Sequence, residues 1–326
     1  MLPKFTYARP TTLDTALRTL DERPSSRVHG GGTDLVGCLR DGVLSADTIV
    51  SLSSVAELRG IRTAADGSFR IGALASVADV AADATVADRY PGLAEAAASV
   101  ASPQLRNQGT IAGNLCQKPR CWYYRGDFHC LRKGGELCYA YNGENQYHCI
   151  VGGELCYIVH PSDTAPMLAA LGSVCRISGN GSSRSVPVAA FHVLPAEDPQ
   201  RETVLEANEI VTEIVIPPPP AGTRSSYRKV RTRQVWDFAI AGVALALTFD
   251  GDTVAKASVF LSGVAPVPWH AAGVEAAITG KVLDAGTIAA AAEAAVEGAE
   301  PLSENGYKVE LVQGLVAEQL EAIAAG

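Results

Sequence analysis

The sequence is poor in positive charge and has no long hydrophobic run. Its 27 Lys and Arg against 35 Asp and Glu give a net charge of −8, which argues against a nucleic-acid partner because phosphate binding needs clustered cations. No uninterrupted apolar stretch reaches the ~18 residues that a membrane-spanning helix needs, so no membrane span is expected. The N-terminal MLPKFTYARP has neither the apolar core of a signal peptide nor a twin-arginine pair. These absences indicate a globular protein of the cytoplasm.

Helical and strand patterns alternate along the chain and predict an α+β fold with two domains. The hydrophobic content of 47% over 326 residues is enough for two filled cores. YIVHPSDTAPMLAALGS (157–173) is typical of a strand, a turn and a helix. Four consecutive prolines at 217–220 end a strand, because proline cannot donate to a sheet ladder. We therefore predict a first domain over residues 1–220 and a second over residues 221–326.

Two glycine-containing loops are candidates for a nucleotide site. GGGTDL (30–35) is not the G-x-G-x-x-G fingerprint, which weakens the alternative of an NAD-binding dehydrogenase. Glycines without Cβ atoms nevertheless let backbone N–H groups converge on a phosphate. SPQLRNQGTIAGNL (102–115) adds two further glycines among polar side chains. Each loop alone is explained as well by a tight turn, but the two together favour ligand binding.

Six of the eight cysteines lie in one short polar segment, which points to metal binding. In a chain that is not exported the thiols stay reduced, so structural disulfides are not expected. The spacing of these cysteines is unlike the C-x₂-C pairs of zinc ribbons, although four thiolates would accept zinc. The six are Cys116, Cys121, Cys130, Cys138, Cys149 and Cys156. Cys38 and Cys175 lie apart from them and are expected to be buried.

Several motifs together resemble one known family. HGGGTDL, SPQLRNQGTIAGNL, HPSD (160–163), YRKVRTRQVWDFA (227–239) and NGYKVELVQGLV (305–316) resemble, in order and spacing, the FAD-binding medium subunit of the xanthine dehydrogenase (molybdenum hydroxylase) family. The resemblance covers nearly the whole chain. It implies two FAD-binding subdomains of the vanillyl-alcohol-oxidase (PCMH) type, about 1–55 and 56–220. A C-terminal domain with a small antiparallel sheet and helices is expected to follow.

The resemblance also implies which residues bind FAD. Main-chain amides of both glycine loops would surround the pyrophosphate, Asp163 would accept from ribose or ribityl hydroxyls, and Lys229 would point toward the flavin. A cation near the flavin would favour the anionic reduced form. The residues expected at the FAD site are Val28, His29, Gly30, Gly31, Gly32, Thr33, Asp34, Leu35, Ser102, Asn107, Gly109, Thr110, Gly113, Asn114, Asp163 and Lys229.

The cysteine segment resembles an insertion, here residues 116–150, that most of the family lacks. It is similar to that of 4-hydroxybenzoyl-CoA reductase and of bacterial aldehyde oxidoreductases whose flavin subunit carries a [4Fe–4S] cluster. By that pattern the metal ligands are Cys121, Cys130, Cys138 and Cys149. Cys116, beside the flavin loop, and Cys156, in a strand pattern, are the competing candidates. Four basic residues would lower the pKa of the ligand thiols: Arg120, Arg125, Arg132 and Lys133.

The function implied by the resemblance is electron transfer, with no catalytic residue in this chain. A large molybdopterin-binding subunit would carry out the substrate chemistry, and a small subunit with two [2Fe–2S] clusters would exchange electrons with the FAD. A ferredoxin or another electron carrier would be the external partner. The alternative location is the periplasm, reached by co-export with a partner subunit. The alternative function is a stand-alone flavoprotein with a structural zinc site in the cysteine segment.

Overall fold

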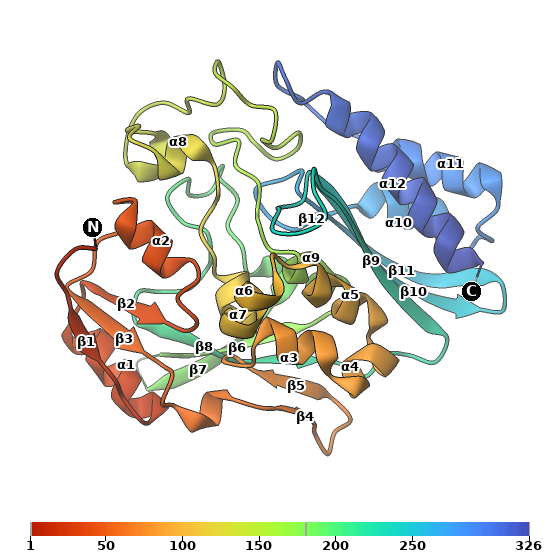
Figure 1. Ribbon diagram of the computed structural model, residues 1–326. Helices are drawn as coiled ribbons and strands as arrows, with labels where there is room; N and C mark the ends of the chain where they lie inside the picture. Colours follow the sequence, from red (N-terminus) through yellow and green to blue (C-terminus); the bar gives the residue numbers. More distant parts are fainter. Residues whose placement is uncertain (1, 180, 326) are drawn as a thin grey trace.

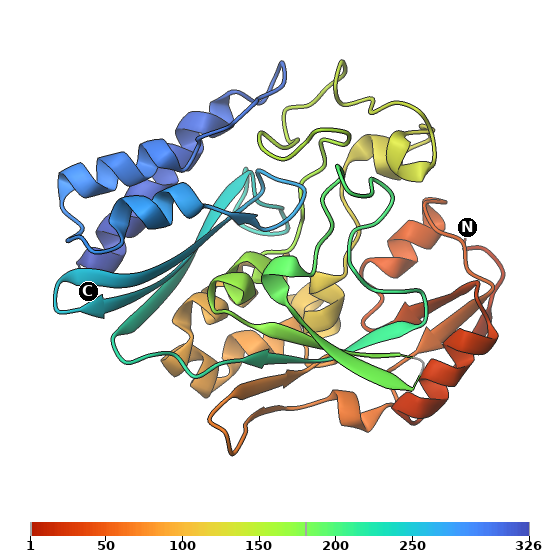
Figure 2. The same cartoon turned by 180° about the vertical axis from the view of Figure 1, so that it is seen from behind.

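The computed structural model describes residues 2–179 and 181–325, which form a mixed helix and sheet protein. Three separate sheets follow one another along the chain, and helices cover one face of the second and third (Figures 1 and 2). The part of the chain so described contains no helix with the length and hydropathy needed to cross a membrane.

A small parallel sheet at the N-terminus carries the first glycine loop. Its strand order is β1-β3-β2, and Thr12 begins the first helix by accepting a hydrogen bond from the backbone N–H of Thr15. The first glycine loop leaves the C-terminal end of β2, the edge at which ligands bind in parallel sheets. The elements are β1 (Thr6–Ala8), α1 (Leu13–Glu22), β2 (Ser26–His29), α2 (Leu35–Arg40) and β3 (Thr48–Ser51).

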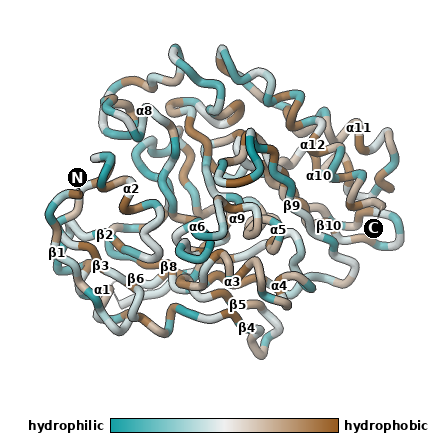
Figure 3. Tube along the Cα trace, in the orientation of Figure 1, coloured by the Kyte–Doolittle hydropathy of each residue, from teal (hydrophilic) through white to brown (hydrophobic). Residues whose placement is uncertain are grey.

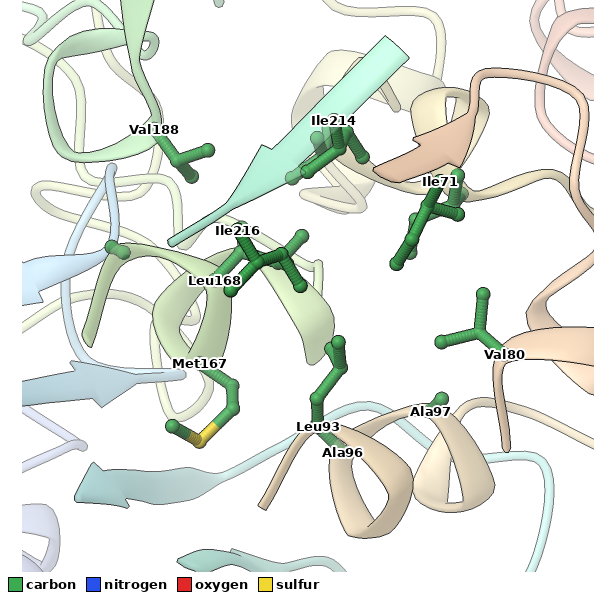
Figure 4. Close-up of a cluster of buried hydrophobic side chains, with 14 of the residues drawn as sticks. Ile71, Val80, Leu93, Ala96, Ala97, Met167, Leu168, Val188, Ile214 and Ile216 are labelled. Atoms are coloured by element: carbon green, nitrogen blue, oxygen red, sulfur yellow. The ribbon is translucent and has the colours of Figure 1, made fainter. Parts of the chain in front are cut away.

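The second sheet has five antiparallel strands and packs against a layer of helices. The strand order β4-β5-β8-β6-β7 places Ile71 and Ile214 opposite Leu93 of α5 and Met167 of α9 (Figure 4). The strands are β4 (Ile61–Thr63), β5 (Phe69–Gly72), β6 (Val174–Gly179), β7 (Ser182–Pro187) and β8 (Glu209–Ile216). The helices are α3 (Val77–Ala82), α4 (Ala84–Arg89), α5 (Pro91–Ser99), α6 (Pro103–Gln108), α7 (Ile111–Leu115) and α9 (Thr164–Ala170).

The third sheet is an antiparallel meander that is covered by three C-terminal helices, as the sequence predicts. Gly251, with φ +60°, and Asp252 connect the two long central strands by a tight turn. A separate apolar core lies between this sheet and its helices. The elements are β9 (Thr223–Val230), β10 (Ala241–Asp250), β11 (Thr253–Ser262), β12 (Trp269–His270), α10 (Ala272–Ile278), α11 (Ala285–Ala294) and α12 (Tyr307–Ala324).

The cysteine segment is irregular and lies between the N-terminal part and the C-terminal helices (Figure 1). It contains the short helix α8 (Trp122–Arg125) and one 3₁₀ turn, and mostly hydrophilic or neutral residues follow its outer loops (Figure 3). The start of α12 holds it in place: Asn305 Nδ2 donates to the carbonyl oxygens of His148 and Cys149. Lys308 Nζ donates to the carbonyl of Tyr147 at 3.0 Å.

One predicted strand is wrong. Residues 157–160, expected to form a strand before α9, have no partner strand in the described chain. Their backbone groups bond instead to two different neighbours: the Cys149 N–H donates to Tyr157 O, and the His160 N–H donates to Ala265 O. Alternating apolar residues can therefore also occur in an extended segment that is buried between other elements but is not hydrogen-bonded to a neighbouring strand. Cys156, placed in a strand pattern by the sequence, begins this segment.

Candidate cofactor site

The two glycine loops meet so closely that a side chain would not fit between them. A Cβ atom at Gly31 would lie 2.8 Å from the carbonyl carbon of Gln108 and nearer still to its oxygen. A Cβ atom at Gly30 would lie 3.0 Å from Thr110 Oγ1. Glycine is therefore required here for close backbone approach. The two loops, which are almost eighty residues apart in sequence, form one structure.

The second loop is shaped by two consecutive helix caps. Ser102 Oγ accepts from the backbone N–H of Leu105 and begins α6, and Thr110 Oγ1 accepts from that of Gly113 and begins α7. Asn114, at the end of this loop, accepts hydrogen bonds at 2.6 Å from Ser162 Oγ and at 2.7 Å from Thr164 Oγ1. The HPSD segment is thus bonded directly to the second loop.

Two cavities adjoin these loops and share several wall residues. Their volumes are about 270 and 200 Å³, and together they lie in the range of small-molecule sites. The common wall residues are Thr33, Asp34, Thr110, Gly113 and Gln117. Of the residues expected at the FAD site, the cavity walls contain Val28, Gly30, Gly31, Gly32, Thr33, Asp34, Leu35, Gly109, Thr110, Gly113, Asn114 and Asp163.

Four of the expected residues lie outside these walls. Ser102 has the structural role of a helix cap, and Asn107 is exposed on α6. His29 lies under the first loop, where its ring would be 2.5 Å from a Cβ atom at Gly32. Lys229 contacts Asp163 instead of the cavity. A direct role of these four residues in binding FAD stays a prediction.

Asp34 has a role that the sequence does not suggest. Although it precedes α2, its side chain does not cap that helix. It accepts instead from the backbone N–H of Lys118 at 2.7 Å, from Arg125 Nη2 at 2.8 Å and from Arg120 Nη2 at 2.9 Å. All three donors belong to the cysteine segment. The carboxylate therefore joins the first glycine loop to that segment.

Asp163 and Lys229 form a buried ion pair beside the first of the two cavities. Lys229 Nζ lies 2.7 Å from Asp163 Oδ2, and Tyr227 Oη donates to Asp163 Oδ1 at 2.9 Å. Both charged side chains are at most 4% exposed. Burial raises the pKa of Asp163, and the attraction of Lys229 acts in the opposite direction. The charged form of Asp163 is therefore stabilised by Lys229, and removing either residue would leave the other charge buried without a partner.

Replacing Lys229 by methionine is expected to destabilise the protein by about 3–5 kcal/mol, because the buried carboxylate loses its counter-charge. Thermal unfolding of the flavin-free protein, followed by circular dichroism, measures the loss. The double variant Lys229→Met with Asp163→Asn should recover most of it, since no charge then remains buried. Equal losses in the single and the double variant would contradict this account.

Four cysteines line a single small cavity in the cysteine segment. They are Cys121, Cys130, Cys138 and Cys156. Cys149, an expected ligand, is not part of this wall, and its Sγ would lie 2.5 Å from a Cβ atom at Gly153. Cys116 borders the second of the two cavities at the glycine loops, and Cys175 belongs to the core of the second sheet. Geometry thus favours Cys156 over Cys149 as the fourth member of the set.

Buried nitrogen donors lie at or next to this cavity, and Arg132 is hydrogen-bonded to Cys156 there. Arg132, whose side chain is 1% exposed, binds Glu202 Oε1 through Nη1 at 3.0 Å. Within the described chain its Nε and Nη2 have no nitrogen or oxygen acceptor, nor do His148 Nδ1 and Trp122 Nε1. Such groups are costly to bury unpaired. Of these residues, Arg132 and His148 border the cavity, where His148 Nε2 lies 3.3 Å from Cys121 Sγ.

The expected lowering of the thiol pKa values is wrong for most of the cysteines. Burial raises the pKa of Cys121 to about 12, and it also raises that of Cys149. Cys156 is the exception: a hydrogen bond from Cys138, together with the charge of Arg132, lowers its pKa to about 6. Of the four basic residues, Arg132 alone borders the cavity. Arg120 and Arg125 bind Asp34, and Lys133 donates to the carbonyl of Gly126.

The cavity between the cysteines is small, about 10 Å³, and the thiols of Cys138 and Cys156 are hydrogen-bonded to each other at its wall. Among the described residues, no three His, Cys, Asp or Glu side chains lie close enough to share one metal ion. A zinc ion needs its four ligands at about 2.0–2.3 Å. A four-iron cluster holds its cysteines further apart, because each binds a different iron.

The flavin-loop cavities and the cysteine cavity are connected by adjacent residues of the chain. Arg120 borders the 270 Å³ cavity and Cys121 borders the cysteine cavity. Both residues also border a further cavity of about 360 Å³. The walls of the two cavities therefore include consecutive residues of the chain.

A larger cavity lies elsewhere and does not have the features of a cofactor site. It measures about 790 Å³ and lies between α9, the four prolines and the strands β11 and β12. None of the residues expected from the sequence to bind a cofactor lines it. The wall residues therefore favour the smaller cavities, at the glycine loops and at the cysteines, as the cofactor sites.

Comparisons with known proteins agree along the whole chain. Residues 3–219 match the family described as the FAD binding domain in molybdopterin dehydrogenase, and residues 225–323 match the CO dehydrogenase flavoprotein C-terminal domain. The chain is 32% identical to the aldehyde oxidoreductase FAD-binding subunit PaoB of Escherichia coli K12, covering 97% of both chains. It is 28% identical to the carbon monoxide dehydrogenase medium chain of Hydrogenophaga pseudoflava, over 98% of this chain and 97% of that one.

Solved structures show the same fold. In the carbon monoxide dehydrogenase of Hydrogenophaga pseudoflava that lacks the Mo-pyranopterin moiety, one chain superimposes with a TM-score of 0.80 at 27% identity. That match covers 100% of this chain and 99% of the other. Quinoline 2-oxidoreductase from Pseudomonas putida 86 gives a TM-score of 0.78 at 25% identity, with the same coverage.

Proposed function

Because the chain belongs to the FAD-binding medium subunits of the xanthine dehydrogenase and carbon monoxide dehydrogenase family, and is thus an oxidoreductase subunit, we propose that it passes electrons through FAD and a [4Fe–4S] cluster. The observation that carries this proposal is the adjacency of Arg120 at the flavin-loop cavity and Cys121 at the cysteine cavity. One peptide unit links the two sites, a short path for an electron.

The residues present fit FAD. The glycines leave room for backbone N–H groups of residues 30–33 to approach a phosphate, and Thr110 and Asn114 line the same space from the second loop. Bound FAD would supply exchange between one-electron and two-electron partners. Asp163 and its ion pair with Lys229 would fix a polar wall. Lys229 would thereby act through Asp163.

The residues present also fit a [4Fe–4S] cluster, with Cys156 in place of Cys149. We assign Cys121, Cys130, Cys138 and Cys156 as ligands, since these four share one cavity. Arg132, which is hydrogen-bonded to Cys156, would donate to sulfur, and so would His148 if Nε2, which lies 3.3 Å from Cys121 Sγ, carries its proton. Hydrogen bonds of this kind and exclusion of water tune the potential of a cluster.

The partners follow from the names of the relatives. A medium chain of carbon monoxide dehydrogenase implies a large and a small chain beside it. A large molybdopterin-binding subunit would perform the substrate chemistry, and a small subunit with two [2Fe–2S] clusters would connect it to the FAD. None of the eight cysteines in the described chain forms a disulfide, and we place the protein in the cytoplasm, where thiols stay reduced.

Elemental analysis of anaerobically purified protein tests the cluster. About four irons and four acid-labile sulfides per chain are expected, with a broad absorption in addition to the flavin bands. Zinc without iron, in a yellow protein, would support the alternative of a flavoprotein with a structural zinc site. Absence of both metals from anaerobic preparations would overturn the assignment of the cysteine cavity.

A further inference from the structure

Exposed large apolar side chains are concentrated in and next to the cysteine segment. Fourteen large hydrophobic residues are exposed in the described chain, and six of them lie within residues 128–155. These six are Phe128, Leu137, Tyr139, Tyr141, Tyr147 and Leu155. Scattered exposed apolar residues are ordinary on a protein surface, but a concentration in one segment marks an interaction site.

Five of the aromatic side chains in this segment form one continuous patch, called here the cluster face. Tyr123 contacts Phe128 at 5.0 Å between ring centroids, and Phe128 contacts Tyr139 at 5.2 Å. Trp122 contacts both Tyr123 and Tyr147 at 6.0 Å. Tyr123 and Tyr139 also line the cysteine cavity. A single layer of rings therefore separates the cysteine cavity from the surface.

The exposed charges of the chain next to the cluster face are mainly acidic, with the exposed Arg233, which borders the same cavity as Trp122 and Tyr147, as a basic exception. Four acidic residues there are exposed: Asp127, Glu136, Glu144 and Glu154. Within the described chain, none of the four forms an ion pair. The three arginines of the same segment that form ion pairs are buried or half-buried, and its Lys118 and Lys133 are half-exposed. Arg120 and Arg125 pair with Asp34, and Arg132 pairs with Glu202. The segment thus presents aromatic rings with an acidic rim.

We propose that the cluster face is the docking surface for a basic one-electron carrier protein. This inference rests on the proposed [4Fe–4S] cluster and names the partner of that same site. Each carrier accepts one electron. Two oxidised carriers are reduced for each reduced FAD that is reoxidised, and the two protons of the reduced FAD are released to solvent. Electron-transfer encounters use small interfaces and opposite charges to speed association.

The sign of the rim distinguishes this partner from the ferredoxin expected from the sequence. An acidic carrier would be repelled by Asp127, Glu136 and Glu144, and like-charge juxtaposition opposes association. A basic carrier would be attracted, with an association rate that falls as salt is added. Exposed aromatic rings would supply the apolar contact at the centre of the interface.

Stopped-flow kinetics of the whole enzyme complex test the proposal. The complex is reduced photochemically with a deazaflavin and mixed with a mitochondrial-type cytochrome c, which is basic, or with an acidic plant-type ferredoxin. The second-order rate constant for cytochrome c reduction is expected to fall steeply with rising ionic strength. The constant for ferredoxin should be smaller and should rise with salt.

A charge-neutralised variant isolates the cluster face. Asp127→Asn, Glu136→Gln and Glu144→Gln together are expected to lower the cytochrome c rate constant about tenfold at low salt and to flatten its salt dependence. The matched control is Glu22→Gln, Asp88→Asn and Asp252→Asn, which changes the net charge equally at exposed sites on other elements. The control should stay within about twofold of the unmodified complex, because screening removes distant charges.

Three outcomes would overturn the proposal. The first is an equal loss in the variant and the control, which would reflect net charge alone. The second is an unchanged rate in the charge-neutralised variant, as expected if a partner subunit covers the face. The third is faster reduction of ferredoxin than of cytochrome c. Iron content and cluster absorption are recorded for every sample. Loss of the cluster would contradict the proposed function, and these measurements distinguish it from failure of docking.

Discussion

Cys156→Ser is expected to remove the iron–sulfur cluster, and Cys149→Ser is expected to retain it. Cys156 borders the cavity that Cys121, Cys130 and Cys138 also line, whereas Cys149 lies behind it against Gly153. Serine is a poor ligand for iron in place of a thiolate, so the loss of one corner should destabilise the whole cluster. The Cys149 variant should suffer only a small packing change at a buried site.

Iron and sulfide content, with visible absorption, measure this difference. The Cys156 variant should lose most of its iron while the flavin bands persist, because the glycine-loop cavities contain neither residue. Cys138→Ser is the positive control, since Cys138 is a ligand in both candidate sets. The opposite result, bleaching by Cys149→Ser and full iron in Cys156→Ser, would restore the ligand set expected from the sequence.

Gly31→Ala is expected to abolish tight FAD binding. The added methyl group would lie 2.8 Å from the carbonyl carbon of Gln108, and this neighbour is backbone that cannot rotate away. The two glycine loops would have to separate, which would misplace the backbone N–H groups of the first loop. We expect the affinity for FAD to fall at least about a hundredfold, which corresponds to ~3 kcal/mol.

The FAD-to-protein ratio after gel filtration, and titration by flavin fluorescence, measure that loss. Gly37→Ala is the matched control in the adjacent helix α2, where the nearest atom would be 3.9 Å from the new methyl group. The control should bind FAD normally and be slightly more stable, because alanine favours a helix over glycine. Full flavin content in the Gly31 variant would show that the loops can separate without loss of the site.

Much of the fold could be predicted from local patterns. Thr12 caps the first helix, the GGG run follows a short strand, and the Asp-Gly pair at 250–251 lies at a hairpin turn. Such signals depend on residues close together in sequence, and physical rules for caps and turns are local. The prediction of a strand at residues 157–160 was wrong because the alternating apolar residues there are buried by distant elements, and no described strand pairs with them.

The residues of the candidate site could be predicted from the sequence, but the contacts between them could not. The sequence identifies Gly31 and Thr110 as loop residues, but not that the two loops touch. It identifies Asp34 beside an expected phosphate, but not that Arg120 and Arg125 bind it. These contacts join residues that are more than seventy positions apart, so no local pattern reports them.

The sequence by itself determined the family, the two glycine loops and the gathering of thiols in one segment, because each is written in neighbouring residues. Only the tertiary structure decided which four cysteines share a cavity, and that three arginines of the segment form ion pairs with Asp34 and Glu202 while its acidic residues are exposed. The physical reason is that packing brings distant residues together and turns side chains inward or outward. Neither is encoded in spacing along the chain.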